Sequence, residues 1–526
     1  QTPGPAGAGT LERTGDLSAQ MVEGIDRFLM KKIAASRKSR DEAGEILKGN
    51  DWPAKEKLRQ EFRRIIGAVD PLAVPIEMEL RGTAAKPSLI AQRPGYAIHR
   101  VAWPALEGVH GEGLLLQPKG TPRGAVICLP DADWSPEAIA GLVPGVERDH
   151  QFARTLAEGG WQTLVMTLVD RDVKHSGNPV IGRKTRQPHR EWIYRQAYEL
   201  GRHVIGYEVR KIEAAVDWLA RDRGAAKRPI AVVGYGEGGL LALYAAALEP
   251  RIDGAFVSGY FGARERVWEE PIYRNVFGQL KRLGDAEIFG LIAPRLLAIE
   301  AASLHGKGRP AQVHAPGLTP GKIADPPAAD VATEFERARR SIGSGEAESE
   351  NPMSFANAGG AGPGIRSSLA AFAARLGPGL GPASIEANTA GSGPKLDLPA
   401  EIAARQARTV RELIDFTQKR LRDSERVRRE TFWNPLPPRK AETWTAQVAA
   451  QRKKFRDDVI GSIKDPKAPP NPKARKLRET DKTVSYEVTL DVWEDVYAWG
   501  YLTLPKDLKE GERRPVVVCQ HGLEGV

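Results

Sequence analysis

Residues 230–244, IAVVGYGEGGLLALY, form an apolar run that breaks at a set of glycines and then continues as a second apolar run. The first run has the length and composition of a buried strand, and the second predicts a helix. A strand, a glycine turn and a helix occur in this order in two kinds of site. Gly234, Gly236 and Gly239 fit the dinucleotide fingerprint G-x-G-x-x-G, whereas Gly234 and Gly238 fit the glycines of the nucleophile elbow G-x-S-x-G. In the elbow alignment, position 236 is a glycine where a serine is required.

The sequence lacks the second feature that a dinucleotide-binding site requires, an acidic residue that binds the ribose. This residue should lie about 20 positions after the glycines, at the end of the next strand. That region reads Ser258-Gly259-Tyr260 and contains no acid. Glu237 would also place a carboxylate in a turn that has to bind pyrophosphate. The elbow alignment is therefore preferred, and no cofactor is expected.

The chain around this turn predicts alternating strands and helices, typical of a mostly parallel sheet covered by helices on both faces. The expected strands are 96–103, 111–117, 124–129, 162–168, 230–235, 254–258, 295–300 and 353–356, and the expected helices are 152–157, 192–219, 331–342 and 367–376.

The remaining chain divides by composition and by an internal repeat. We expect a disordered segment at 1–16, a helical segment at 17–90 whose helix packs on the next domain, the α/β domain at 91–376, a Gly/Pro-rich linker at 377–398, a helical and Pro-rich connector at 399–480, and a second domain from 481 to 526. The expected strands 486–493, 498–506 and 514–525 repeat the order of 96–103, 111–119 and 124–133, and Cys519 falls where Cys128 falls. Three such strands cannot bury both faces of a sheet, so we expect the second copy to be truncated.

On these features the chain resembles the α/β-hydrolase superfamily, in particular tandem-domain proteins allied to acetyl xylan esterases and dienelactone hydrolases. The resemblance covers about 96–376 and begins again at 486. It implies an α/β-hydrolase fold followed by a helical linker and the first strands of a second such domain. It also implies a serine, an acid and a histidine in that chain order. Gly236 then stands at the nucleophile position.

The other triad members have weak candidates. The acid should follow the strand that ends at Glu300, and no Asp or Glu occurs in 301–324, so Glu300 is the candidate, with an ion pair to a nearby arginine as the alternative. The histidine should lie in 358–364, which contains none, and His305 and His314 precede that position. Glu237 cannot replace the serine without placing Tyr235 where a small residue is needed, so we expect Glu237 to face solvent or to cap the helix. The first domain is predicted to lack the triad.

The second copy of the repeat differs from the first in the residues that follow its third expected strand. His521 and Gly522 resemble the His-Gly oxyanion loop of hydrolases, where the first copy has Pro130 and Asp131, a residue without an N–H and a negative charge. We therefore expect this chain to be the non-catalytic first half of a secreted or periplasmic serine esterase. Its substrate would be a small-molecule or carbohydrate ester, and its two hydrolase domains would pack together. The alternative is a stand-alone pseudo-hydrolase that binds carbohydrate or acts as a scaffold, with Tyr260, Trp268 and Tyr273 as candidate ligand contacts, or as core residues.

Composition excludes several other classes. The chain of 526 residues has a net charge of +10, but basic and acidic residues alternate, as in 408–429, and no nucleic-acid motif accompanies them. No apolar run reaches the roughly 18 residues of a membrane span. His175 and His189 lie near Asp170 and Asp172 without a metal-ligand spacing, so no metal is expected. The expectation of export rests on the start at Gln1 and the polar, Gly/Pro-rich first ten residues; two cysteines form no disulfide framework.

Overall fold

The computed structural model describes residues 5, 7–49, 51–84, 86–221, 227–304, 321–341, 352–358, 366–377, 397–436, 440–464, 467–509 and 511–520. The chain forms two compact units, residues 36–435 and residues 1–35 with 436–526. Of the predicted linker at 377–398, only its first residue and its last two are among the described residues.

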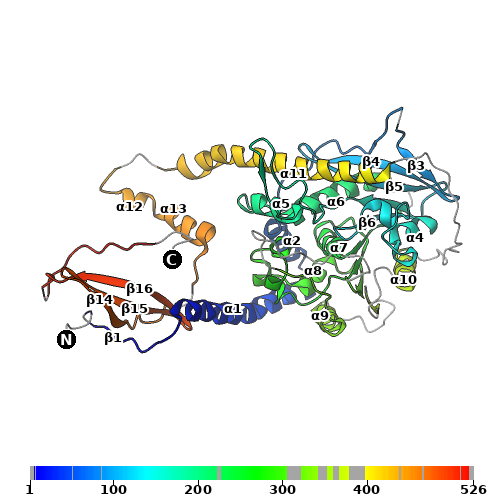
Figure 1. Ribbon diagram of the computed structural model, residues 1–526. Helices are drawn as coiled ribbons and strands as arrows, with labels where there is room; N and C mark the ends of the chain where they lie inside the picture. Colours follow the sequence, from blue (N-terminus) through cyan, green and yellow to red (C-terminus); the bar gives the residue numbers. More distant parts are fainter. Residues whose placement is uncertain are drawn as a thin grey trace. The chain divides into compact units, whose positions relative to one another are not determined.

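A ten-stranded sheet lies at the centre of residues 36–435 (Figure 1). Its order is β13-β12-β11-β10-β6-β7-β5-β4-β2, with β3 also paired to β4. Neighbours from β13 to β7 are parallel, and the pairs that involve β5 and β4 are antiparallel. The strands are β2 (Glu79–Leu80), β3 (Leu89–Gln92), β4 (Tyr96–Leu106), β5 (Val109–Pro118), β6 (Ala125–Leu129), β7 (Gln162–Met166), β10 (Ile230–Tyr235), β11 (Gly254–Ser258), β12 (Leu296–Ala301) and β13 (Met353–Asn357). A separate hairpin joins β8 (Gly177–Asn178) and β9 (Arg183–Lys184).

The central strands are buried on both faces, which explains their unbroken apolar sequence. Along β6, Ile127 and Leu129 enter one core cluster, whereas Val126 and Cys128 enter the other. Helices cover both faces. The first cluster includes α2 (Trp52–Ile65), α5 (His189–Tyr198), α6 (Val204–Arg221), α7 (Glu237–Leu248), α8 (Asp285–Ile292), α9 (Ala328–Ser341) and α11 (Leu398–Arg428), and the second includes α3 (Pro136–Ile139), α4 (Phe152–Glu158) and α10 (Arg366–Leu376). Short 3-10 turns are η1 (Arg148–His150), η2 (Val267–Glu269), η3 (Ile272–Arg274) and η4 (Gln279–Lys281).

Two predictions about helices need correction. The single helix expected at 192–219 is two helices, α5 and α6, because the chain turns at Gly201, whose φ of 66° suits glycine and ends a helix. The helix expected within a connector, α11, instead packs on the ten-stranded sheet. Its Val410, Leu413 and Phe416 are buried in the first core cluster, and Figure 1 shows α11 lying along β4 and β5.

The second unit contains a four-stranded sheet in the order β1-β14-β15-β16. Its strands are β1 (Gly9–Thr10), β14 (Lys473–Glu479), β15 (Thr483–Trp493) and β16 (Val496–Pro505), and its helical elements are the first part of α1 (Leu17–Lys48), α12 (Trp444–Gln447), α13 (Ala449–Lys454) and the π-helix η6 (Phe455–Gly461). A π-helical turn, η5 (Arg429–Trp433), extends α11. The antiparallel pairing of β14, β15 and β16 repeats that of β3, β4 and β5.

One expectation for this unit holds in part and two are wrong. The last turns of α1 pack on the α/β domain as expected, with Ala43 and Leu47 buried in the first core cluster, whereas its first part stacks Phe28 on Trp493 of β15 with ring centroids 5.5 Å apart. Residues 9–10, expected to be disordered, pair with β14. The third strand expected at 514–525 is absent from residues 511–520, where Val516, Val517 and Val518 are at least 82% exposed. Its counterpart β6 is held between β7 and β10, and the described residues between 440 and 520 contain no strands that could flank it in this way.

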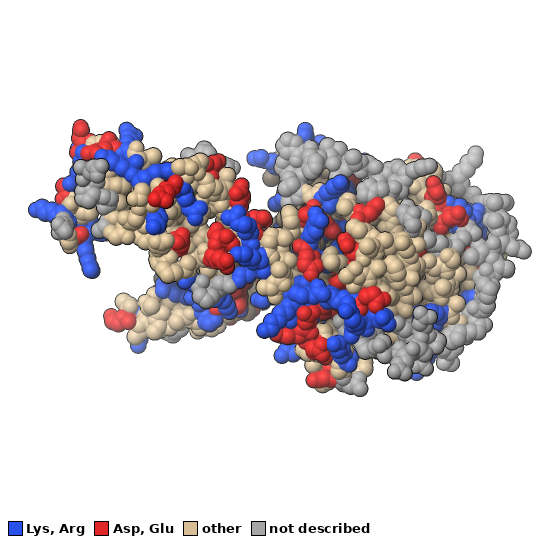
Figure 2. Space-filling view, turned by 90° about the horizontal axis from the view of Figure 1, so that it is seen from below, with Lys and Arg blue, Asp and Glu red and all other residues tan. Residues whose placement is uncertain are grey.

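Two further expectations concern the mixing of charges on the surface and the lack of a membrane-spanning helix. On the face drawn in Figure 2, Lys and Arg side chains are interspersed with Asp and Glu, as the alternating sequence suggested. None of the helices in the described ranges has the length and apolar character needed to cross a membrane.

Candidate functional site

The turn between β10 and α7 has a backbone that only glycine permits at two positions. A Cβ on Gly234 would lie 1.9 Å from the carbonyl oxygen of Gly238, and a Cβ on Gly238 would lie 1.9 Å from that of Leu129. Gly236 has φ 58° and ψ −117°, a backbone conformation that residues with a side chain rarely adopt outside functional turns. The geometry is therefore that of a strained strand-to-helix elbow, and position 236 carries no side chain.

Asp131, two residues after β6, lies directly against this turn. A Cβ on Gly236 would meet its Oδ1 at 2.4 Å. The backbone N–H of Glu237 donates to the same Oδ1 at 3.1 Å. In a nucleophile elbow, the N–H after the nucleophile is one of the two oxyanion donors. In this protein, the N–H of Glu237 donates to the carboxylate of Asp131 instead.

Arg171, in the loop after β7, holds Asp131 in place. Its guanidinium donates to both carboxylate oxygens, at 2.8 Å and 3.0 Å, and to Asp133 at 2.8 Å. The Arg171 side chain is 7% exposed. A bidentate arginine–carboxylate pair in a buried setting is a strong and directional contact. Asp131 is thus fixed in front of the elbow.

Glu237 points inward, so the expectation that it faces solvent or caps α7 is wrong. Its side chain is fully buried and accepts from Arg274 Nε at 2.7 Å and from Arg171 at 3.1 Å, while Arg190 lies 3.8 Å from its second oxygen. Burial alone would raise the pKa of this carboxyl, but Arg274, Arg190 and Arg171 together lower it to about 2. Glu237 is therefore ionised at neutral pH.

The contacts extend into a connected set of charged side chains. Arg190 donates to both oxygens of Glu208, at 2.9 Å and 3.0 Å, and Arg274 donates to Glu270 at 3.1 Å. We name the set the buried ionic cluster; its members are Asp131, Arg171, Arg190, Glu208, Glu237, Glu270 and Arg274. Nearby, burial lowers the pKa of His203 to about 3, so this imidazole is neutral at physiological pH. The space beside the elbow is filled by charges that pair with one another.

The candidate acid Glu300 lies at the end of β12, buried, and accepts from Ser258 Oγ at 2.6 Å. A second carboxylate near the end of β12 was not among the candidates predicted for the acid. Asp325 accepts from Ser303 Oγ at 2.6 Å and from the N–H of Leu304, just after β12. It lies one residue beyond the stretch 301–324 in which the acid was sought. His305 and His314 lie outside the described residues, as do His521 and Gly522.

His175 and His189, the histidines of the polar loop near Asp170, are engaged in structural contacts. His189 Nδ1 lies 2.5 Å from Asp170 Oδ1, and its Nε2 accepts from the N–H of His175 at 2.8 Å. Both ring nitrogens of His189 thus have protein partners, and the ring stacks on that of His175. Across the described ranges, no group of three or more His, Cys, Asp or Glu is placed to hold a metal ion.

Of the three aromatic candidates, two are buried. The hydroxyl of Tyr260 lies 3.2 Å from that of Tyr244, and Arg264 stacks 4.6 Å from the Tyr260 ring. Tyr273 accepts from Arg171 Nε at 3.0 Å. Trp268 is half exposed. The two tyrosines pack within the domain, and of the three only Trp268 has a solvent-facing ring.

Two of the cavities in residues 36–435 are relevant to ligand binding, and both lie away from the elbow. The larger, about 1030 Å³, is lined by α5, the β8–β9 hairpin and α11, including Trp192, Gln196 and Gln418. The smaller, about 220 Å³, is lined by β4, β5, α11 and the segment before β3. Neither is lined by Gly236 or Asp131.

Comparison with known proteins finds one matching family and several similar structures. Residues 112–274 match the model of the Dienelactone hydrolase family. The chain is similar in structure to a glucuronoyl esterase from Solibacter usitatus (13% identity, TM-score 0.40, covering 62% of this chain and 94% of the other) and to Acetyl Xylan Esterase 1 from Thermoanaerobacterium sp. (14%, 0.36, 61% and 93%). It is also similar to a glucuronoyl esterase from Teredinibacter turnerae (14%, 0.38, 62% and 84%). No curated protein sequence matches the chain. Residues 36–435 have the strand order and the strand-to-helix elbow of an α/β-hydrolase fold, and residues 112–274 within them match the Dienelactone hydrolase family.

Proposed function

We propose that residues 36–435 are a non-catalytic α/β-hydrolase domain belonging to a secreted serine carboxyl-ester hydrolase. The nucleophile of that enzyme would lie in a second hydrolase domain, which starts at 481 and continues beyond Val526. One observation carries the proposal: the N–H of Glu237 donates to Asp131 instead of being open to a substrate oxygen.

The chemistry of ester hydrolysis explains why this observation matters. A serine hydroxyl attacks the carbonyl, a histidine accepts its proton, and backbone N–H groups stabilise the oxyanion that forms. Gly236 provides no hydroxyl. The carboxylate of Asp131 occupies the donor and would repel an oxyanion at the same place. Neither attack nor oxyanion stabilisation is available at this elbow.

The repeat supports the second half of the proposal. β14, β15 and β16 pair as β3, β4 and β5 do, which is the pairing expected if a second hydrolase sheet begins there. The family match supports a carboxyl ester as the substrate class, and a carbohydrate ester is the form we propose.

A fluorophosphonate probe applied to source cells tests this proposal. We expect an adduct on a gene product heavier than 57.4 kDa, with the modified serine in a peptide that follows residue 526. A labelled peptide within residues 36–435 would contradict the proposal, and so would a native product of 57.4 kDa that carries no adduct.

One observation favours the alternative, a stand-alone carbohydrate-binding pseudo-hydrolase. The cavity of about 1030 Å³ is lined by Trp192, Gln196 and Gln418. The amides of Gln418 and Gln196 are joined at 2.9 Å, and Trp192 Nε1 is buried without a hydrogen-bond partner in the described part of the chain. An aromatic ring with amide groups suits a sugar. Xylo-oligosaccharide binding that is lost in Trp192→Ala, by a native product of 57.4 kDa, would select this alternative.

A further inference from the structure

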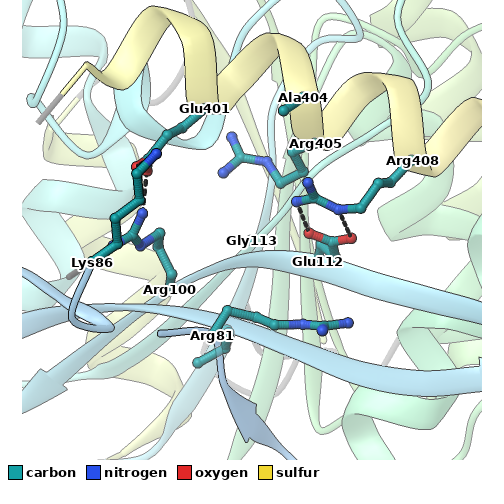
Figure 3. A pocket seen from close by; sticks show the side chains of 10 residues that line it. Arg81, Lys86, Arg100, Glu112, Gly113, Glu401, Ala404, Arg405 and Arg408 are labelled. Carbon is teal, nitrogen blue, oxygen red and sulfur yellow. Dashed lines mark hydrogen bonds and ion pairs between the residues drawn. The ribbon is translucent and has the colours of Figure 1, made fainter. Parts of the chain in front are cut away.

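Seven of the ten residues that line the smaller cavity, about 220 Å³, are charged (Figure 3). Strands β4 and β5 form its floor and α11 forms its roof. Arg100 and Glu112 come from the strands, and Glu401, Arg405 and Arg408 come from successive turns of the helix. Arg81 and Lys86 approach from the segment between β2 and β3.

Positive charge is in excess at this cavity. Five cationic side chains line it, whereas its lining includes two carboxylates, Glu112 and Glu401. A third carboxylate, Glu137, lies behind Arg405 and accepts from both of its terminal nitrogens, at 2.8 Å and 2.6 Å. The five cations thus exceed the three carboxylates by two charges. Outside the cavity, Glu79 lies 3.8 Å from Arg81 and is half exposed, which makes that pair weak.

Four of the five cations fall into two groups with different roles. Arg405 and Arg408 are each fixed by a bidentate carboxylate, Glu137 and Glu112 respectively, so their positions are set before any ligand arrives. Arg81 and Lys86 are held loosely: Lys86 is 3.9 Å from Glu401, and the two side chains are 44% and 67% exposed. They are free to turn toward a ligand.

Unused hydrogen-bond donors point to what is missing. Arg405 is 5% exposed, yet its Nε has no hydrogen-bond partner among the described residues, and the same holds for the buried Nε of Arg100. Arg100 is otherwise bonded to Glu401 and to the carbonyl of Pro87. A buried N–H without an acceptor costs free energy that an oxygen-rich ligand would recover.

We propose that this cavity binds a small oxyanion with two negative charges, a phosphate or a dicarboxylate. Arginine suits both because its planar donors match two oxygens at once. The cavity is below the roughly 300 Å³ at which sites for larger ligands begin, so the ligand is a small ion or metabolite. The site is separate from the elbow, so it does not depend on whether the domain is catalytic.

Isothermal titration of the full chain at constant ionic strength tests the proposal, with inorganic phosphate, malonate and chloride as probes. We expect phosphate or malonate to bind while chloride does not, and the tighter of the two identifies the ligand class. Arg81→Gln with Lys86→Gln should weaken that binding about tenfold or more. Arg426→Gln with Arg429→Gln removes the same charge from exposed positions at the end of α11 and its extension, and should leave binding within about twofold.

Three results would overturn the proposal: no binding of phosphate or malonate beyond that of chloride, equal weakening in the two double variants, or unchanged binding in Arg81→Gln with Lys86→Gln. The substituted side chains of the test variant are substantially exposed, so folding is expected to be retained, and circular dichroism verifies it.

Discussion

Glu237→Gln removes the central negative charge of the buried ionic cluster while keeping the shape of the side chain. The pKa of Glu237 falls from an ordinary 4.5 to about 2, which corresponds to about 3 kcal/mol of stability at neutral pH. Removing one partner of a buried ion pair typically costs about 3–5 kcal/mol. We therefore expect the variant to lose about 3 kcal/mol or more of unfolding free energy at pH 7.

The pH dependence gives a second test of the same charge. A carboxyl whose pKa is depressed by folding stabilises the protein above its unfolded pKa, and the contribution is lost as the pH falls through the folded value. The difference in unfolding free energy between the wild type and Glu237→Gln should therefore be constant above about pH 5. It should shrink to roughly half or less of that value by pH 3.

Amide hydrogen exchange of peptides covering β10 and α7 measures this free energy within the domain itself. Glu425→Gln, which removes an exposed carboxylate on α11, is the matched control and should change stability by no more than about 0.5 kcal/mol. A loss of unfolding free energy below about 1 kcal/mol in Glu237→Gln would refute the assignment of an ionised Glu237 held by arginines. A difference in unfolding free energy that does not become smaller in acid would refute it as well.

Gly236→Ser alone and with Asp131→Ala should both remain inactive toward p-nitrophenyl acetate. The serine Cβ meets Asp131 in the first variant, and residues 358–364, where the base is expected, contain no histidine in either; turnover above a heat-treated blank would contradict this. Asp285→Asn should change the pH dependence of stability in the opposite sense to Glu237→Gln. Burial raises the pKa of Asp285 to about 7, so the wild type should lose up to about 4 kcal/mol relative to the variant as the pH rises from 4 to 8, and parallel stability curves would contradict it.

The positions of the strands along the chain and the elbow could be predicted from the sequence because both depend on local pattern. Buried parallel strands read as continuous apolar runs, and the glycines at 234 and 238 are required by backbone contacts of 1.9 Å. The placement of α11 on the sheet was missed, although Val410, Leu413 and Phe416 form an apolar face at helical spacing.

The buried ionic cluster could not be predicted in the same way. Arg171, Arg190 and Arg274 come from a loop, a helix and a 3-10 turn far apart in sequence, and each is indistinguishable from a surface arginine by its neighbours. Glu237 begins a helix, a position where a carboxylate is favourable in solvent as well. Only the fold brings these four side chains together, so the sequence indicated the missing serine but not what fills the space beside it.

The most direct test of the central claim is the intact mass of the purified chain after incubation with a fluorophosphonate probe. We expect no adduct, because position 236 has no hydroxyl and Asp131 occupies the N–H of Glu237. A stoichiometric adduct on a residue between 36 and 435 would show that the domain is catalytic and that the elbow has been misassigned.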